Sequence, residues 1–370
     1  MGRDIVIGTE ETAPVMSEGQ ATALSRRSTG WIIALFVGIA LGALMSLVPI
    51  PYVILQPGPI TNTLGVGADG KPLISVAGQE TFPTSGALDF TTVAVLGGPK
   101  NPVNAWEWIV GHLDGSSQVV PEEQLFPKGV TSKQVDQVSR ADMTNSQQEA
   151  TAVALRGLGR TVKEIVTIAD LTKDSPAKGV LRSGDVLVSV DGKAVTASAA
   201  VIAAVRAHKG GESVAFTVRR DGKEQILTVK TAASNGPTVV GVFLRAAFDF
   251  ETKVSINAGD VGGPSAGMMF ALAIYDKLTP GSLTGGANIA GTGTIDSAGK
   301  VGPIGGIQQK LVGAKRGGAT WFLAPAGNCA EVVGHIPEGI KVVKVATFTQ
   351  ARDAVQAIAA KKTSSLPSCG

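Results

Sequence analysis

The chain has 370 residues, which is long enough for two folded domains and a membrane anchor. Its 47 glycines and low aromatic content favour a turn-rich α+β architecture over a helical bundle. The net charge of +3 is small and spread along the sequence, which argues against a nucleic-acid-binding surface and a nucleic-acid partner.

Residues 1–30 are polar and are expected to form a disordered tail. Residues 31–50 carry no charge and would span about 30 Å as a helix, the thickness of a hydrocarbon core. Arg26 and Arg27 precede this run, whereas the next basic residue after it is Lys71. The positive-inside rule therefore predicts a cytoplasmic N-terminus, a single transmembrane helix and residues 51–370 outside the cell membrane. A cleaved signal peptide is the alternative, although its apolar region is usually only about 7–15 residues long.

The segment from residue 51 to residue 158 is expected to mix strands and helices. Prolines keep its first nine residues extended. The expected elements are strands at 73–76 and 88–96, helices at 104–110 and 143–158, and a surface loop at 119–123. Thr144 or Asn145 is the expected cap of the longer helix. The Trp106 and Trp108 pair has two interpretations, packing against the protein and contact with a membrane interface.

Residues 160–233 are predicted to form a separate β-rich module. It has a strand at 164–168, a helix at 198–208 and two strands joined at Asp221-Gly222. The run from Asp174 to Gly192, DSPAKGVLRSGDVLVSVDG, resembles the most recognisable segment of PDZ domains. The resemblance implies a groove that binds an extended peptide by adding it to a sheet edge. Gly157-Leu158-Gly159 is the candidate carboxylate-binding loop, and a spacer that binds no peptide is the alternative.

The motif Gly263-Pro264-Ser265-Ala266-Gly267 is followed by an apolar run that predicts a buried helix. Proline suits the first position of a helix, which would place Ser265 in a first helical turn. Free backbone N–H groups and the positive end of the helix dipole favour an anion there. A hydroxyl at this point is a candidate nucleophile.

A second helix is predicted at 304–316, and on it Lys310 lies on the same side as Ile307, Leu311 and Ala314. A lysine that faces a core is uncommon, because an unpaired buried charge is costly. A free lysine has a pKa of about 10.4 and is protonated at neutral pH, whereas burial lowers that pKa and makes a base. Ser265 and Lys310 are therefore predicted to be a nucleophile and its general base.

Three other interpretations of these residues exist. The motif around Ser265 also fits the G-x-S-x-G elbow of Ser-His-Asp esterases, which would need His335. A second possibility is a glycine-rich turn before a core helix, with Lys310 reaching along its stem to water. A phosphate-binding loop near Gly299-Lys300 is rejected, because the Walker A spacing is absent and valine follows the lysine.

Three motifs in order resemble the signature of Lon-type peptidases. They are Gly263-Pro264-Ser265-Ala266-Gly267, Gly291-Thr292-Gly293-Thr294-Ile295, and the run from Gly302 to Leu311, GPIGGIQQKL. The resemblance implies a Ser-Lys dyad of Ser265 and Lys310, with Thr292 hydrogen-bonded to the lysine. The whole chain looks like the membrane-anchored, PDZ-containing Lon-like proteases of Gram-positive bacteria. It departs from full-length Lon in having no Walker A motif, so ATP-driven unfolding is not implied.

The expected mechanism is hydrolysis of peptide bonds in extracytoplasmic proteins, with no metal and no cofactor. Backbone N–H groups around Gly263 and Ala266 are expected to hold the oxyanion. Two cysteines and three scattered histidines give no metal-ligand spacing. In an oxidising compartment Cys329 and Cys369 could pair as a disulfide, and two free thiols are the alternative.

The predicted order is a tail at 1–30, a transmembrane helix at 31–50, the first part of the Lon-like fold at 51–158, a PDZ domain at 160–233, the proteolytic domain at 237–362 and a tail at 363–370. A strand at 248–256 leads to Ser265, so the PDZ domain is expected to be inserted into the protease fold. A homo-oligomer is implied only by analogy with Lon rings. The rival function from another class is a non-catalytic PDZ scaffold on a protease-like fold.

Overall fold

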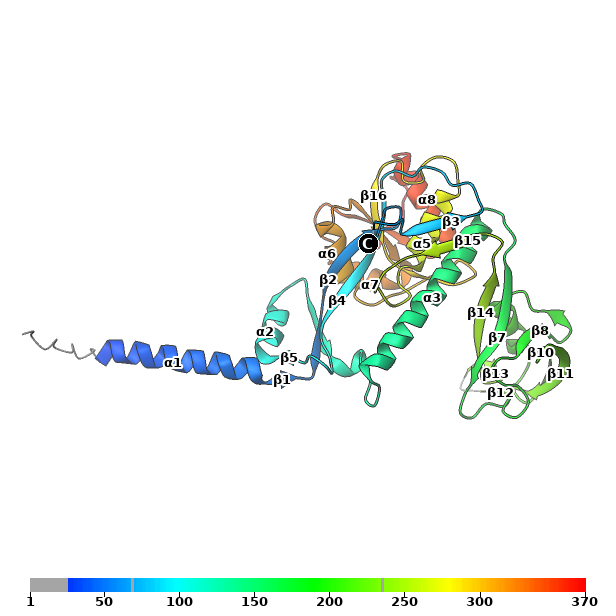
Figure 1. Cartoon of the computed structure of the whole chain (residues 1–370), viewed down its shortest axis with the longest axis horizontal. Coiled ribbons are helices and arrows are strands. Elements are labelled where there is room, and N and C mark those ends of the chain that lie inside the picture. The colour runs from blue at the N-terminus through cyan, green and yellow to red at the C-terminus, as the bar shows by residue number, and fades with distance from the viewer. Residues whose placement is uncertain (1–25, 68–69, 234–235) are drawn as a thin grey trace, which may run out of the picture.

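The computed structural model describes residues 26–67, 70–233 and 236–370. Helix α1 (Arg26–Leu47) extends away from the rest of the molecule (Figure 1). Its stretch Thr29–Leu47 is long and apolar enough to cross a membrane, and none of that stretch is buried in the protein. The helix predicted at 31–50 matches α1 only up to Leu47, because residues 49–50 form a strand. Most of the predicted tail at 1–30 lies outside the described residues.

The part of the chain predicted to form the Lon-like fold, here called the protease part, is built on a six-stranded sheet in the order β20-β19-β16-β4-β2-β6. These strands are β2 (Tyr52–Asn62), β4 (Ala87–Gly97), β6 (Gln118–Pro121), β16 (Asn288–Gly291), β19 (Trp321–Pro325) and β20 (Lys341–Val345). β4, β16, β19 and β20 are parallel, while β2 is antiparallel to both β4 and β6. Half of the sheet therefore comes from before residue 158 and half from after residue 237.

Alternating residues of the sheet bury its two faces against different helices. Ile289 and Leu323 pack with α5 (Gly267–Lys277), while their neighbours Ala290 and Phe322 pack with α6 (Ile307–Arg316). α3 (Ser132–Gly157) and α8 (Phe348–Ala359) cover the α5 side. The short α7 (Cys329–Val332) belongs to the α6 side. The mixed α+β fold class is confirmed.

The segment predicted to be a PDZ domain, here called the PDZ module, has its own sheet in the order β11-β10-β8-β7-β14 and its own apolar core. Its elements are β7 (Lys163–Leu171), β8 (Val186–Val190), β9 (Lys193–Ala194), α4 (Ser198–Arg206), β10 (Ser213–Arg220), β11 (Lys223–Lys230) and β14 (Val242–Asp249). Figure 1 shows this module beside the protease part. Because β14 pairs with β7 along its whole length, the module extends past the predicted boundary at residue 233.

Short elements complete the fold. They are β1 (Pro49–Ile50) with β5 (Val103–Asn104), α2 (Ala105–Leu113), β3 (Ile74–Ala77) with β15 (Lys253–Ile256), β12 (Ala232–Ala233) with β13 (Thr238–Val239), β17 (Thr294–Ile295) with β18 (Val301–Gly302), and 3-10 turns at Glu122–Gln124 and Ala326–Asn328.

Two predictions in the first half of the chain were wrong. The helix expected from residue 143 begins at Ser132, where Thr131 and Gln134 form a capping box. Its first turns are mostly exposed and polar, so no apolar periodicity marked them. The loop expected at 119–123 is largely strand β6, which pairs with β2 and buries Val120.

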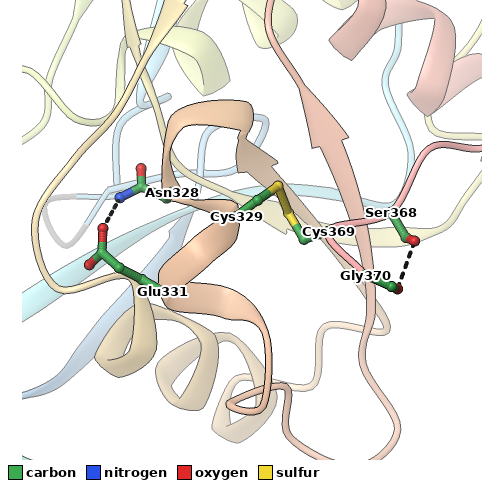
Figure 2. The surroundings of a disulfide bond; sticks show 6 residues. All are labelled: Asn328, Cys329, Glu331, Ser368, Cys369 and Gly370. Carbon is green, nitrogen blue, oxygen red and sulfur yellow. Dashed lines mark hydrogen bonds between the residues drawn. A yellow bond between two sulfur atoms is a disulfide. The ribbon is translucent and has the colours of Figure 1, made fainter.

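Cys329 and Cys369 form a disulfide that closes 40 residues of chain (Figure 2). Cys369 is buried in the core beneath α6, together with Ile307 and Leu311. The N–H of Lys344 on β20 donates to the carbonyl of Pro367 at 2.8 Å, which fixes the same tail to the sheet. The C-terminal residues are thus part of the protease fold.

We expect Cys369→Ser to lower the free energy of unfolding of the protease part by about 4 kcal/mol, because the cross-link restricts the unfolded chain. Denaturant unfolding of the full chain in detergent measures this. The matched controls are the double variant Cys329→Ser/Cys369→Ser and the wild type with dithiothreitol, which should lose as much. Equal stability of oxidised and reduced wild type would contradict the prediction.

Candidate active site

The structure brings Ser265 and Lys310 into contact. The Nζ of Lys310 donates to Ser265 Oγ at 2.8 Å and to Thr292 Oγ1 at 3.0 Å. The three residues come from the turn before α5, from α6 and from the segment after β16. The three motifs that are widely separated in the sequence therefore meet at one amine.

Lys310 is almost completely buried, with 3% of its surface exposed. Ile307, Leu311 and Ala314 of the same helix pack into the core around it. Burial lowers the pKa of the Lys310 amine to about 8, because the charged form loses its hydration. The lower pKa increases the fraction of neutral amine near physiological pH, and a general base must be neutral.

α6 approaches the sheet closely, and this approach fixes the lysine. A Cβ added to Gly313 would lie 2.8 Å from the carbonyl oxygen of Gly58 on β2, so only glycine fits there. The helix begins after Gly306, whose φ of 68° is left-handed. Its expected start at residue 304 is therefore corrected to Ile307.

Thr292 orients the lysine amine. Its hydroxyl donates to the carbonyl oxygen of Ser265 at 3.0 Å, and its oxygen accepts from Lys310 Nζ. The side chain is fully buried, so water does not compete for these bonds. With its N–H directed to Thr292, a neutral Lys310 amine can direct its lone pair toward the Ser265 hydroxyl.

Helix α3 holds the Ser265 turn from outside the motif. The N–H of Gly263 donates to the carbonyl of Ser139 at 2.9 Å, and Ser146 Oγ donates to the carbonyl of Pro264 at 2.9 Å. Sequence reasoning missed both serines. Their signal was weak, because serines on a polar helix usually face solvent.

The helix expected to begin at Pro264 begins at Gly267 instead. The carbonyl of Pro264 is held by Ser146 and by the N–H of Gly267, so residues 264–266 form a turn. A Cβ on Gly267 would lie 2.6 Å from Ser146 Oγ, which shows how tightly this turn packs on α3. Ser265 thus sits immediately before the first helical turn.

The two backbone groups expected to hold the oxyanion differ in availability. The N–H of Gly263 is already bonded to Ser139, so that expectation is not met in this structure. Ala266 lines the cavity beside Ser265, and within the described ranges its N–H and that of Ser265 have no protein acceptor. The available donors are therefore Ser265 and Ala266.

A cavity of about 510 Å³ opens in front of Ser265 and Lys310. Its apolar lining comes from Phe90 and Val93 of β4, Met143 of α3 and Val261. A smaller hollow of about 200 Å³ adjoins it and shares Met143, Val261 and the exposed Asp260. The two hollows meet at Met143 and Val261, so the approach to Ser265 is open along this side of the molecule.

His335 does not belong to the site. It lies exposed in the loop after α7, its Nδ1 is 3.2 Å from the carbonyl oxygen of Val333, and it does not line the cavity. Ser265 has an amine rather than an imidazole as its hydrogen-bond partner.

In the PDZ module, the edge strand beside β7 is β14, and α4 packs near it. The prediction that Gly157-Leu158-Gly159 forms the carboxylate-binding loop was wrong, because Gly157 ends α3 and packs against Phe348 and Tyr275 of the protease part. The segment that enters the edge strand is Val239-Val240-Gly241, with Gly241 at a left-handed φ of 71°.

Arg156 joins the two modules. Its guanidinium donates to the carbonyl of Ser297 in the protease part and to Glu164 Oε2 of β7 at 3.3 Å. Glu164 is buried and also accepts from the N–H of Ser198 at 2.9 Å, at the start of α4. The PDZ helix is therefore connected to the protease core through two charged side chains.

Comparison with known proteins identifies both modules. A model of the PDZ domain matches residues 136–231, and a model of the Lon protease C-terminal proteolytic domain matches residues 246–361. The chain thus contains a region similar to PDZ domains and a region similar to the proteolytic domain of Lon proteases, and Ser265, Thr292 and Lys310 lie in the latter.

Lon proteases are similar to the C-terminal part of the chain. Lon protease of Clostridioides difficile is 43% identical over 93 residues, which cover 25% of this chain and 11% of that protein. Lon protease 1 of Bacillus subtilis is 35% identical over 94 residues, covering 25% and 12%. The chain therefore spans only about a tenth of the length of these relatives.

Among solved structures, the PDZ domain of an SdrC-like protein from Listeria monocytogenes is 27% identical and covers 21% of this chain and 85% of that one, with a TM-score of 0.21.

Proposed function

We propose that the chain is a membrane-anchored serine endopeptidase that uses a Ser265–Lys310 dyad. The observation that carries this proposal is the buried Lys310 amine 2.8 Å from Ser265 Oγ. Burying a lysine without a carboxylate partner lowers the stability of the fold. Its contact with a hydroxyl is what a general base for a serine nucleophile requires.

In the proposed reaction, neutral Lys310 accepts the hydroxyl proton of Ser265 while Oγ attacks the carbonyl carbon of a peptide bond. The N–H groups of Ser265 and Ala266 stabilise the negative charge on the carbonyl oxygen. The Lys310 ammonium then returns the proton to the leaving amine, and an acyl-enzyme remains. Water, deprotonated by the same amine, hydrolyses the acyl-enzyme and restores both side chains.

The substrate is proposed to be an extracytoplasmic protein or peptide, cleaved without ATP. The disulfide between Cys329 and Cys369 supports an oxidising compartment for the protease part, since such bonds persist outside the cytoplasm. Together with α1 and the positive-inside rule, it supports a cytoplasmic N-terminus and an extracellular catalytic domain. The PDZ edge at β14 is the proposed place for peptide presentation or gating.

A serine-directed fluorophosphonate tests the dyad directly, because it forms a phosphorus–oxygen bond with an activated serine and releases fluoride. We expect one equivalent on the wild-type chain and none on Ser265→Ala, by intact mass. Ser255→Ala, an exposed serine of β15, and His335→Ala are matched controls and should label like wild type. A wild-type chain that stays unlabelled would favour the non-catalytic scaffold, and loss of label in His335→Ala would favour the esterase.

A further inference from the structure

Helix α2 presents an apolar stripe to the outside of the molecule. Trp106, Val110 and Leu113 follow one another at helical spacing and are 58%, 44% and 80% exposed. The opposite side of the helix packs inward. Trp108 contacts Tyr52 with ring centres 6.2 Å apart, and Gly111 lies close against Ile54. Trp108 therefore fits the packing interpretation, whereas Trp106 is exposed, as contact with a membrane interface requires.

No charge interrupts this stripe. The carboxylate of α2, on Glu107, is used in the capping box with Asn104, where it accepts the Asn104 N–H at 3.0 Å. An exposed apolar face on a folded domain marks a surface that meets something other than water.

The position of α2 says what that surface meets. α1 ends at Leu47, and the N–H of Ala105 donates to the carbonyl of Val48 at 3.2 Å. The β1–β5 pairing fixes this junction, with Pro49 opposite Asn104. Figure 1 shows α2 beside the end of α1. Trp106 therefore directly follows Ala105, the residue that is hydrogen-bonded to Val48 at the end of the apolar helix.

We propose that the outer face of α2, formed by Trp106, Val110 and Leu113, lies in the head-group region of the bilayer and binds a lipid surface. This inference rests on the proposed membrane anchoring by α1. A bilayer that holds the apolar run to Leu47 has its surface at Val48, where α2 starts. Tryptophan and an apolar helix face are the groups that favour this interfacial layer.

The binding would orient the protease. α2 packs on β2 and β6, and β2 pairs with β4, which lines the cavity in front of Ser265. α1 alone attaches the chain to the bilayer at one place. With α2 also seated, the cavity keeps a fixed orientation relative to the membrane, which favours substrates that approach along its surface.

Tryptophan quenching tests the proposal on the full chain in phosphatidylcholine vesicles whose acyl chains are brominated near the head group. The four tryptophans are separated by difference, using Trp106→Phe, Trp31→Phe and Trp321→Phe, which leave Trp108 as the remainder. We expect lipid bromine to quench the Trp106 and Trp31 components and to leave Trp321 of β19 unquenched. Trp31 lies at the other end of α1 and reports on the anchor alone.

The outcomes separate the two claims. If Trp31 is quenched and Trp106 is not, the seating of α2 is refuted while the anchor stands. If neither is quenched, both are refuted. If Trp106 is shielded from lipid bromine and from aqueous acrylamide alike, a protein covers α2 and the lipid proposal is wrong.

A charge variant adds a second readout. Val110→Glu/Leu113→Glu should abolish bromine quenching of Trp106 yet retain Ser265-dependent peptide hydrolysis in detergent. Ile226→Glu on the PDZ strand β11, a position 74% exposed, is the matched control and should leave the quenching unchanged. Unchanged quenching of Trp106 in the α2 variant would count against the proposal.

Discussion

Ser265→Ala is expected to lower the rate of peptide hydrolysis by a factor of about 10⁴ or more, because it removes the hydroxyl that attacks the substrate in the proposed reaction. The fold should survive. Ser265 Oγ has one hydrogen bond, from Lys310, and the turn itself is held by backbone groups bonded to α3 and to Gly293. The measurement is cleavage of an unstructured protein such as casein, followed with the melting temperature of the same samples.

Ser255→Ala serves as the control for the exchange of a serine in the same part of the chain, and should keep wild-type activity. Residual cleavage by Ser265→Ala at more than about a hundredth of the wild-type rate would place the nucleophile elsewhere, since the rest of a dyad site contributes little without it.

Lys310→Met is expected to inactivate the enzyme and to stabilise it. Methionine keeps the length of the side chain and removes the amine, so Ser265 loses its base. At pH 7 the native state pays to hold a charged amine whose pKa is lowered from 10.5 to about 8. Removing that cost should raise the free energy of unfolding by about 3 kcal/mol. Denaturant unfolding and casein cleavage at pH 7 measure the two effects.

The stability of the wild type should also depend on pH through Lys310. Because the folded pKa lies below the unfolded one, the unfolded state binds more protons between about pH 8 and 10.5, and wild-type stability should rise with pH across that window. Lys310→Met should lack this rise. Cleavage by the wild type should also increase as pH passes 8 and Lys310 becomes neutral.

Lys310→Arg separates charge from basicity, since a guanidinium stays protonated and should be inactive at every pH. Wild-type activity that is flat from pH 6 to 10, or a Lys310→Met chain less stable than wild type at pH 7, would show that the amine is not a buried base.

The sequence predicted the fold class and the separate roles of Ser265 and Lys310 from local patterns, whereas their meeting was predicted from the resemblance of three separated motifs to the Lon-type signature. Each local pattern can be recognised within about ten residues. One is a glycine-rich turn before an apolar helix, and the other is a lysine among apolar residues at helical spacing. The PDZ segment around Ser175 and Gly184 was recognisable for the same reason.

What failed depended on partners distant in the sequence. β14 alternates half-buried and exposed residues, a pattern that suits an edge strand of either sheet, and only its pairing with β7 assigns it to the PDZ module. Likewise the N–H of Gly263 looked free because its acceptor, Ser139, lies on a helix whose polar first half gave no signal. Local patterns do not encode such pairings.

The position of the PDZ module within the chain is expected to affect the order of folding. Thr91 and Gly291 are 200 residues apart yet are bonded in the central sheet, so that sheet cannot close until most of the chain exists. The PDZ module is continuous in sequence, and its first and last strands put Lys163 opposite Asp249. Once it folds, the long gap between α3 and β15 becomes a short one, and the entropy lost in joining the two halves of the protease falls accordingly. A PDZ module that folds first is therefore expected to bring α3 close to the segment that carries Ser265.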